Sequence, residues 1–304
     1  MSAKRVFVKE GHLRPTWRAI SYVIALLVGS FLIQIPLGIL LVLAVLAGLI
    51  DQSSLTQLES SLPLLVIGTV ANLVLILPLT YLFRRFLDGK DLLSLGLRRG
   101  PGWARETLAG LVLGAALIGL VFLVEWGLGW LTIEGFSWQV QSPLRLLLLM
   151  AVYLLLFVAV AFYEELSYRG YILQNLNLDW ATPVGLVASS MLFGLFHALN
   201  PNVTALALFN IFLAGVLMGV CYLVTRRLWL PMAFHFSWNF VQGPVLSFPV
   251  SGLAPTGLLL TSSGGDPLLT GGAFGPEGGL LGTGVIFLGL VALLFWWWAG
   301  RRQR

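Results

Sequence analysis

The chain contains few charged residues, few histidines and a single cysteine. Charged residues make up 10% of its 304 residues and hydrophobic residues 58%, whereas soluble domains carry about 25% charged residues. This composition excludes an ordinary soluble domain and indicates an integral membrane protein. The single cysteine, Cys221, excludes an intramolecular disulfide. Only three histidines are present, so a histidine inside an apolar segment stands out as a candidate functional residue.

Long apolar runs are abundant, and each is a candidate membrane span. A helix needs about 20 apolar residues to cross the hydrocarbon core, at about 1.5 Å of rise per residue. The runs predict an all-α integral membrane protein, a bundle of about eight transmembrane helices in a single domain over residues 1–304. The predicted spans cover residues 18–50, 62–83, 106–133, 145–175, 181–199, 204–225, 229–248 and 280–299.

Basic residues are confined to the breaks between these runs, on one side of the predicted bundle. They are Lys4, Arg5, Lys9, Arg14, Arg18, Arg84, Arg85, Lys90, Arg98, Arg99, Arg105, Arg169, Arg226, Arg227, Arg301, Arg302 and Arg304. Only Arg145 falls on the other side. Because cytoplasmic loops carry an excess of lysine and arginine, both termini are predicted to be cytoplasmic. The positive charge therefore predicts a lipid bilayer as the environment and no nucleic acid as partner. In a bacterial cell this multi-pass protein would lie in the plasma membrane.

Residues 251–279 form a glycine-rich break on the predicted extracytoplasmic side. Nine glycines, with prolines and serines, predict a flexible connector. A gate or a contact surface for substrate is the alternative. Elsewhere, Gly110 with Gly114, and Gly215 with Gly219, form small-xxx-small pairs that predict close helix packing.

Two adjacent glutamates, Glu164 and Glu165, stand inside an apolar segment. An ionised carboxylate near the bilayer centre costs roughly 2.5–3.5 kcal/mol even on insertion scales, so compensation is expected. Glu165 and Arg169 are i and i+4 on one helix face, which predicts an ion pair. Glu164 lies about 140° round the helix from Arg169 and has no cation in its own helix. The alternative is that both glutamates lie in water at the cytoplasmic end of the helix.

His197 lies in the next apolar segment. The turn before that segment is centred midway between Glu164 and His197, so an antiparallel hairpin brings the two residues to the same depth. Phe193 lies one turn before His197 and is expected to orient its ring. The alternative is that His197 is an ordinary core residue with its hydrogen bonds satisfied.

His235 and Asn239 are i and i+4 in the segment 229–248, so their polar groups converge. They could donate hydrogen bonds to an oxyanion, or they could hold neighbouring helices together. Counted from the inner turns, His235 is roughly 13 Å less deep than His197 at helical rise. Tilted helices would have to absorb that difference if the two histidines share a site.

One acid, two histidines and an asparagine on three helices predict a hydrolytic site. Glu164 would deprotonate a water, and His197 would hold that water or pass the proton to a leaving amine. His235 and Asn239 would stabilise the oxyanion of a tetrahedral intermediate. No cofactor is needed for this chemistry. Alternatively, Glu164, His197 and His235 suit a zinc site with one position open for water, although neither histidine belongs to a His-Glu-x-x-His helix.

Three motifs occur in order along the chain: Glu164-Glu165-x-x-x-Arg169, Phe193-x-x-x-His197 and His235-x-x-x-Asn239. Together they resemble the CPBP family, the CAAX prenyl protease and bacteriocin-processing membrane proteins, also called the ABI family. The resemblance lies within a predicted catalytic core over residues 145–248. It implies an eight-helix intramembrane endopeptidase whose cavity opens to the cytosol and whose mechanism needs a glutamate and no metal.

The resemblance also implies a role for each motif residue. Glu164 would activate water together with His197, and His235 and Asn239 would form the oxyanion hole. Glu165 and Arg169 would support the site. The substrate would be a membrane-anchored or membrane-proximal, CAAX-like protein or peptide.

Two other functions remain open on the sequence. One is a non-catalytic immunity or scaffold protein of the same family. The other is a transporter with a proton-relay glutamate, which is disfavoured because the polar residues cluster in one place. Glu125, Asn72 and Asn210 are isolated from that cluster in the sequence. The oligomeric state and the identity of the substrate stay open.

Overall fold

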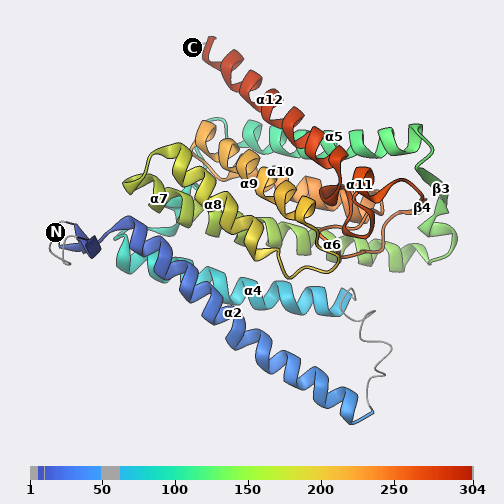
Figure 1. Cartoon of the computed structure of the whole chain (residues 1–304), viewed down its shortest axis with the longest axis horizontal. Coiled ribbons are helices and arrows are strands. Elements are labelled where there is room, and N and C mark those ends of the chain that lie inside the picture. The colour runs from blue at the N-terminus through green and yellow to red at the C-terminus, as the bar shows by residue number, and fades with distance from the viewer. Residues whose placement is uncertain (1–5, 10, 49–61, 303–304) are drawn as a thin grey trace.

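The computed structural model of the chain describes residues 6–9, 11–48 and 62–302, and these are mostly helical (Figure 1). Among the described residues, six helices are long and apolar enough to cross a membrane, which agrees with the predicted α-helical, multi-pass membrane protein. They run over Pro15–Leu46, Leu62–Leu87, Trp103–Gly127, Pro143–Asp179, Ala205–Thr225 and Leu280–Gly300. The predicted number of eight is therefore not confirmed, and the cytoplasmic placement of the termini stays a prediction. Lys4, Arg5, Arg304 and the end of the first predicted span lie outside the described residues.

α-Helices make up most of the described residues. In chain order they are α2 (Pro15–Leu46), α4 (Leu62–Leu82), α5 (Trp103–Gly127), α6 (Pro143–Glu165), α7 (Leu173–Asp179), α8 (Thr182–Phe196), α9 (Ala205–Thr225), α10 (Trp229–Phe240), α11 (Pro267–Thr270) and α12 (Leu280–Arg302). Short π-helical turns follow three of them: η2 (Phe83–Leu87), η5 (Leu166–Ile172) and η6 (Val241–Val245). Short 3₁₀ turns are η3 (Leu92–Leu95), η4 (Ser137–Gln139), η7 (Gly272–Phe274) and η8 (Pro276–Gly278).

Two predicted spans are shorter than expected. The span predicted over 181–199 is α8, with 15 residues, and it ends just before an Asn-Pro turn in which Asn202 has a positive φ of 57°. The span predicted over 229–248 is α10, with 12 residues, which passes into η6. Pro244 lies inside η6, and proline lacks the N–H that an α-helix needs at that position. Local turn chemistry therefore shortens both spans.

Short strands, which were not predicted from the sequence, form two antiparallel pairs. Strand β1 (Val8–Lys9) pairs with β2 (His12–Leu13) at the N-terminal end. Strand β3 (Leu131–Phe136) pairs antiparallel with β4 (Leu259–Ser263). The predicted span 106–133 therefore ends earlier, and the glycine-rich segment is structured. The prediction of a flexible connector over 251–279 is wrong, because this segment carries β4, α11, η7 and η8.

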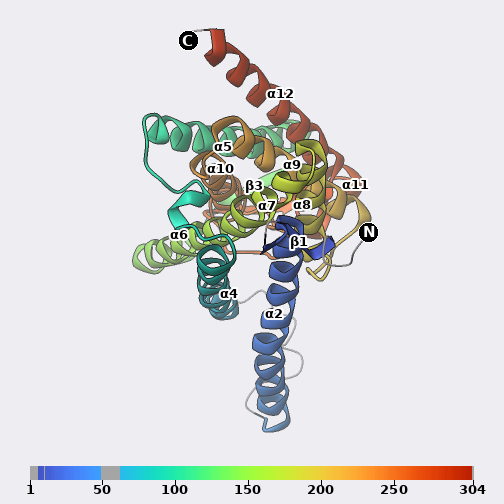
Figure 2. The same cartoon turned by 90° about the vertical axis from the view of Figure 1, so that its left-hand side faces the viewer.

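The helices form a central bundle with two peripheral parts (Figures 1 and 2). Helix α10 packs against α5, α6 and α9, and α8 packs against α9. Helices α2 and α4 pack against each other on one flank, and α12 leaves the bundle on another. The later half of α2 extends away from the bundle, where side chains such as Leu40 and Leu46 are exposed. An exposed apolar surface of this kind suits contact with lipid.

Charged side chains gather at the end of the bundle where α7 lies. Asp88 forms ion pairs with Arg18 at 3.1 Å and with Arg84 at 2.8 Å. Its carboxylate also accepts a hydrogen bond from Asn175 at 3.5 Å. Thr16 donates to Asp179 in the same region. These contacts fasten α2 to the turn after α4 and to α7.

Glycines let α5 and α10 approach closely, as the small-xxx-small pairs predict. A Cβ at Gly114 would lie 2.5 Å from the Phe234 carbonyl oxygen, and a Cβ at Gly110 would overlap the Leu230 carbonyl oxygen. On α9, a Cβ at Gly215 would lie 3.2 Å from the Ser190 Cα. The backbones therefore meet where no side chain fits, and this contact positions α10 and the residues it carries.

We expect Gly114→Ala to destabilise the protein by at least about 1 kcal/mol, because its methyl group clashes with the α10 backbone. Gly119→Ala on the same helix is the matched control, since nothing lies within 4 Å of a Cβ there and alanine is the better helix former. Thermal unfolding in detergent would compare the two variants. Equal melting temperatures would contradict the close packing of α5 on α10.

Candidate functional site

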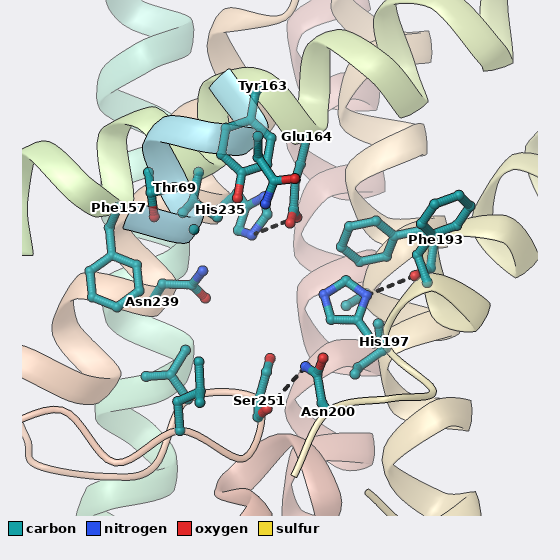
Figure 3. Close-up of a pocket in the computed structure, with 18 of the residues that line it drawn as sticks. Thr69, Phe157, Tyr163, Glu164, Phe193, His197, Asn200, His235, Asn239 and Ser251 are labelled. Atoms are coloured by element: carbon teal, nitrogen blue, oxygen red, sulfur yellow. Dashed lines mark hydrogen bonds and ion pairs between the residues drawn. The ribbon is translucent and has the colours of Figure 1, made fainter. Parts of the chain in front are cut away.

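A cavity of about 520 Å³ lies inside the bundle (Figure 3). Side chains from α2, α4, α6, α8, α9, α10 and the glycine-rich segment line it. Glu164, His197, His235 and Asn239, the four predicted catalytic residues, are all among them. In Figure 3, Glu164, His235 and Asn239 lie on one side of the cavity and His197 lies on the other. Cavities of this size hold small ligands or short segments of larger ones.

The predicted ion pair between Glu165 and Arg169 is present. Arg169 Nη1 lies 2.7 Å from Glu165 Oε1, and both side chains are buried. Helix α6 ends at Glu165 and continues as η5, a π-helical turn of the kind that frequently occurs at functional sites. Arg169 Nη2 also donates to the Gly215 carbonyl at 3.1 Å. The pair therefore neutralises two buried charges and joins η5 to α9.

Glu165 has a second partner that the sequence analysis did not predict. His235 Nδ1 lies 3.0 Å from Glu165 Oε1. Because a carboxylate only accepts, Nδ1 must carry the proton in this hydrogen bond. The other ring nitrogen, Nε2, lies 3.8 Å from Glu164 Oε2. The two adjacent glutamates thus flank one histidine, and Glu165 fixes the orientation of its ring.

His197 occupies the C-cap position of α8. Its Nδ1 donates to the Phe193 carbonyl oxygen at 2.8 Å, which leaves Nε2 of the neutral ring as an acceptor. The Phe193 ring packs on the His197 ring with centroids 4.8 Å apart, as predicted. No ion pair or hydrogen bond joins His197 to Glu164 in the described part of the chain, although both residues line the cavity.

Phe193 connects the parts of the site. Its ring centroid lies 4.4 Å from the Arg169 guanidinium carbon and 6.1 Å from the His235 ring centroid. A cation over an aromatic face is attracted by the ring quadrupole. The two histidine rings therefore pack near the same phenylalanine ring. The depth difference counted from the sequence does not keep the two histidines apart.

Asn239 lies one turn beyond His235 on α10 and also lines the cavity. Its side chain makes no hydrogen bond with the residues that the structure describes. An amide that is buried, with 8% of its surface exposed, normally has a partner. Asn239 can therefore donate to a ligand in the cavity.

Further polar residues line the cavity, among them Glu277, Ser251 and Asn200, which were not predicted from the sequence. Glu277 Oε2 accepts hydrogen bonds from the Ser251 N–H at 2.6 Å and from its hydroxyl at 3.0 Å. Asn200 donates to the Ser251 carbonyl at 3.0 Å. Burial raises the pKa of Glu277, although the Ser251 bonds oppose that shift. The sequence feature that could have identified Glu277 is that it is a lone acid in the sequence Gly-Pro-Glu-Gly-Gly.

The zinc alternative finds no support in the arrangement of the donors. Among the described residues, no three or more His, Cys, Asp or Glu side chains lie close enough together to hold a metal ion. Glu164, His197 and His235 surround the cavity without converging on one point. Independence from metal ions nevertheless stays a prediction that only an activity measurement can test.

One family model matches the chain. Residues 146–241 match the family described as type II CAAX prenyl endopeptidase Rce1-like. The match covers all three motifs and confirms the resemblance to the CPBP family. Neither the curated proteins nor the solved structures that were compared gave a match.

Breaking the buried Glu165–Arg169 ion pair should lower the free energy of unfolding. We expect Arg169→Met to destabilise the protein by about 3–5 kcal/mol, because the Glu165 charge loses its cation. The double variant Glu165→Gln/Arg169→Met should recover part of that loss. Arg98→Met is the control, since the Arg98–Asp91 pair is largely exposed and such pairs contribute less than about 1 kcal/mol. Denaturant unfolding in detergent measures all three, and equal effects of Arg169→Met and Arg98→Met would refute the role of the buried pair.

Proposed function

We propose that this protein, given the Rce1-like match of its central segment, is an intramembrane endopeptidase. It would hydrolyse a peptide bond in a membrane-anchored or membrane-proximal, CAAX-like substrate. One observation carries the proposal: a single cavity holds an acid, two oriented histidines and an amide with no partner among the described residues. These are the groups that hydrolysis of an amide with an activated water requires.

Glu164 is the proposed general base. Its side chain lines the cavity, is 17% exposed and makes no hydrogen bond with the described residues. A water molecule in the cavity would donate the hydrogen bond that this carboxylate lacks. Glu164 would take a proton from that water as its oxygen attacks the carbonyl carbon of the peptide bond. The C–O bond would then form as the carbonyl oxygen becomes an oxyanion.

His197 is the proposed proton carrier. With Nδ1 bound to the Phe193 carbonyl, its Nε2 atom can accept a proton in the cavity and release it again. The leaving nitrogen must gain a proton when the C–N bond breaks. His197 would receive that proton from Glu164 through a water molecule in the cavity and would then donate it to the leaving nitrogen.

His235 and Asn239 are the proposed oxyanion donors. Nδ1–H of His235 is already bound to Glu165, so Nε2 can donate to an oxyanion only when the ring carries a second proton. The carboxylates of Glu164 and Glu165 both favour that positively charged ring. The Asn239 amide would donate the second hydrogen bond. Glu165 and Arg169 act through His235 and are proposed as positioning residues.

We expect Glu164→Gln to lower kcat about 10²–10⁴-fold, the usual contribution of a general base. Cleavage of a panel of membrane-anchored peptides would measure this. Glu125→Gln is the matched control, because Glu125 is likewise an acid on a membrane-spanning helix, buried in α5, and does not line the cavity. Full activity of a folded Glu164→Gln variant would refute the proposal. Peptide binding without any cleavage by the natural chain would indicate the non-catalytic immunity or scaffold role.

We expect a chelator to leave the cleavage rate unchanged, because the proposed reaction uses only side chains and water. Treatment with a strong chelator, followed by addition of zinc, would measure this on the same peptides. Activity that is lost with the chelator and restored by zinc would replace the glutamate mechanism with a metal-dependent one.

A further inference from the structure

The cavity is lined by two carboxylates and by no fixed positive charge. Glu164 and Glu277 both line it, and among the described lining residues there is no lysine or arginine. Arg169 is buried behind the site and is already bound to Glu165. A ligand in this cavity therefore meets a negative field that only the histidines can offset.

Glu277 is held firmly in the cavity wall. Asn210 of α9 donates to the Glu277 carbonyl at 2.9 Å and to the Gly279 carbonyl at 2.8 Å. Thr283 in turn donates to the Asn210 side-chain oxygen at 2.7 Å. Ser251 fixes the carboxylate itself through Oε2. Since α9, α12 and the glycine-rich segment all contribute, the side chain has a defined position before any ligand binds.

No lysine or arginine among the described residues forms an ion pair with Glu277, in contrast to Glu165. The partners of Glu277 are the neutral Ser251 and, nearby, Gln242 and His197. Only 9% of its surface is exposed, and a buried carboxylate without a counter-charge is unfavourable. A bound ammonium or guanidinium group would supply that counter-charge and would form a charge-assisted hydrogen bond.

We propose that Glu277 is a specificity-determining residue that binds a cationic group of the substrate peptide. This inference rests on the proposed endopeptidase function, since it assigns a subsite to the same cavity. The group would be a lysine or arginine side chain, or a free amino terminus.

Peptide binding tests this subsite apart from catalysis. The full chain with Glu164→Gln, which prevents cleavage, is placed in phosphatidylcholine nanodiscs, so that the lipid has no net charge. Three hydrophobic peptides, acetylated and amidated, differ only in one residue: lysine, norleucine or glutamate. A fourth peptide carries norleucine and a free amino terminus. Fluorescence titration gives the Kd of each.

We expect the lysine peptide to bind about tenfold more tightly than the norleucine peptide, and the glutamate peptide to bind most weakly. Adding Glu277→Gln should reduce the tenfold preference to about twofold or less, and Glu277→Asp should retain most of it. Glu134→Gln is the matched control, because Glu134 is an exposed acid on β3 outside the cavity. A preference for the free amino terminus alone would identify the terminus, rather than a side chain, as the bound cation.

Equal affinities for the lysine, norleucine and free-amino-terminus peptides would overturn the inference. This comparison needs no variant of Glu277, so its result does not depend on whether such a variant folds. A preference for the cationic peptide that survives Glu277→Gln would overturn it as well. The failure of the proposed endopeptidase activity looks different: the natural chain would then cleave none of the peptides while the Glu277-dependent preference persisted.

Discussion

The site depends on one carboxylate oxygen. Glu165 Oε1 lies 2.7 Å from Arg169 and 3.0 Å from His235, so it joins the turn after α6 to α10. Arg169 extends the connection to α9 through the Gly215 carbonyl. A buried guanidinium is tolerated only with such a partner. The orientation of His235, and with it the direction in which Nε2 faces the cavity, follows from this contact. The proposed catalytic acid beside it, Glu164, keeps a carboxylate oxygen free of hydrogen bonds to the described residues.

The glycine-rich segment contributes to the site through close packing. Gly252 has a positive φ of 87°, and a Cβ there would overlap the Pro201 carbonyl oxygen. Gly275, with a φ of 96°, faces the Pro249 carbonyl in the same way. Any other residue would push the segment outward. Glycine therefore brings Ser251 and Glu277 into the cavity wall, and a composition that is typical of linkers here produces a tightly packed wall.

Contacts within one helix were predictable from the sequence, and contacts between distant segments were not. The i and i+4 spacing was sufficient to predict the Glu165–Arg169 pair and the packing of Phe193 on His197. The bond between His235 and Glu165 depends on how α10 is rotated about its axis, which periodicity in an almost wholly apolar helix does not specify. Glu277 reaches the site through the tertiary packing of a long segment. The opening of the cavity toward the cytosol stays a prediction. Residues of the glycine-rich segment, which is predicted to lie on the extracytoplasmic side, also line the cavity.

Helix α8 has consequences for the surrounding lipid. Its 15 residues span about 22 Å, whereas the hydrocarbon core of a typical bilayer is about 30 Å thick. Val184, Met191 and Leu195 on α8 are exposed, so this short helix presents an apolar surface that suits contact with acyl chains. Such hydrophobic mismatch is relieved by local thinning of the bilayer. On this flank the polar headgroups and their water would come closer to His197 than in an undisturbed membrane, and the thickness of the bilayer becomes a physical variable of the site.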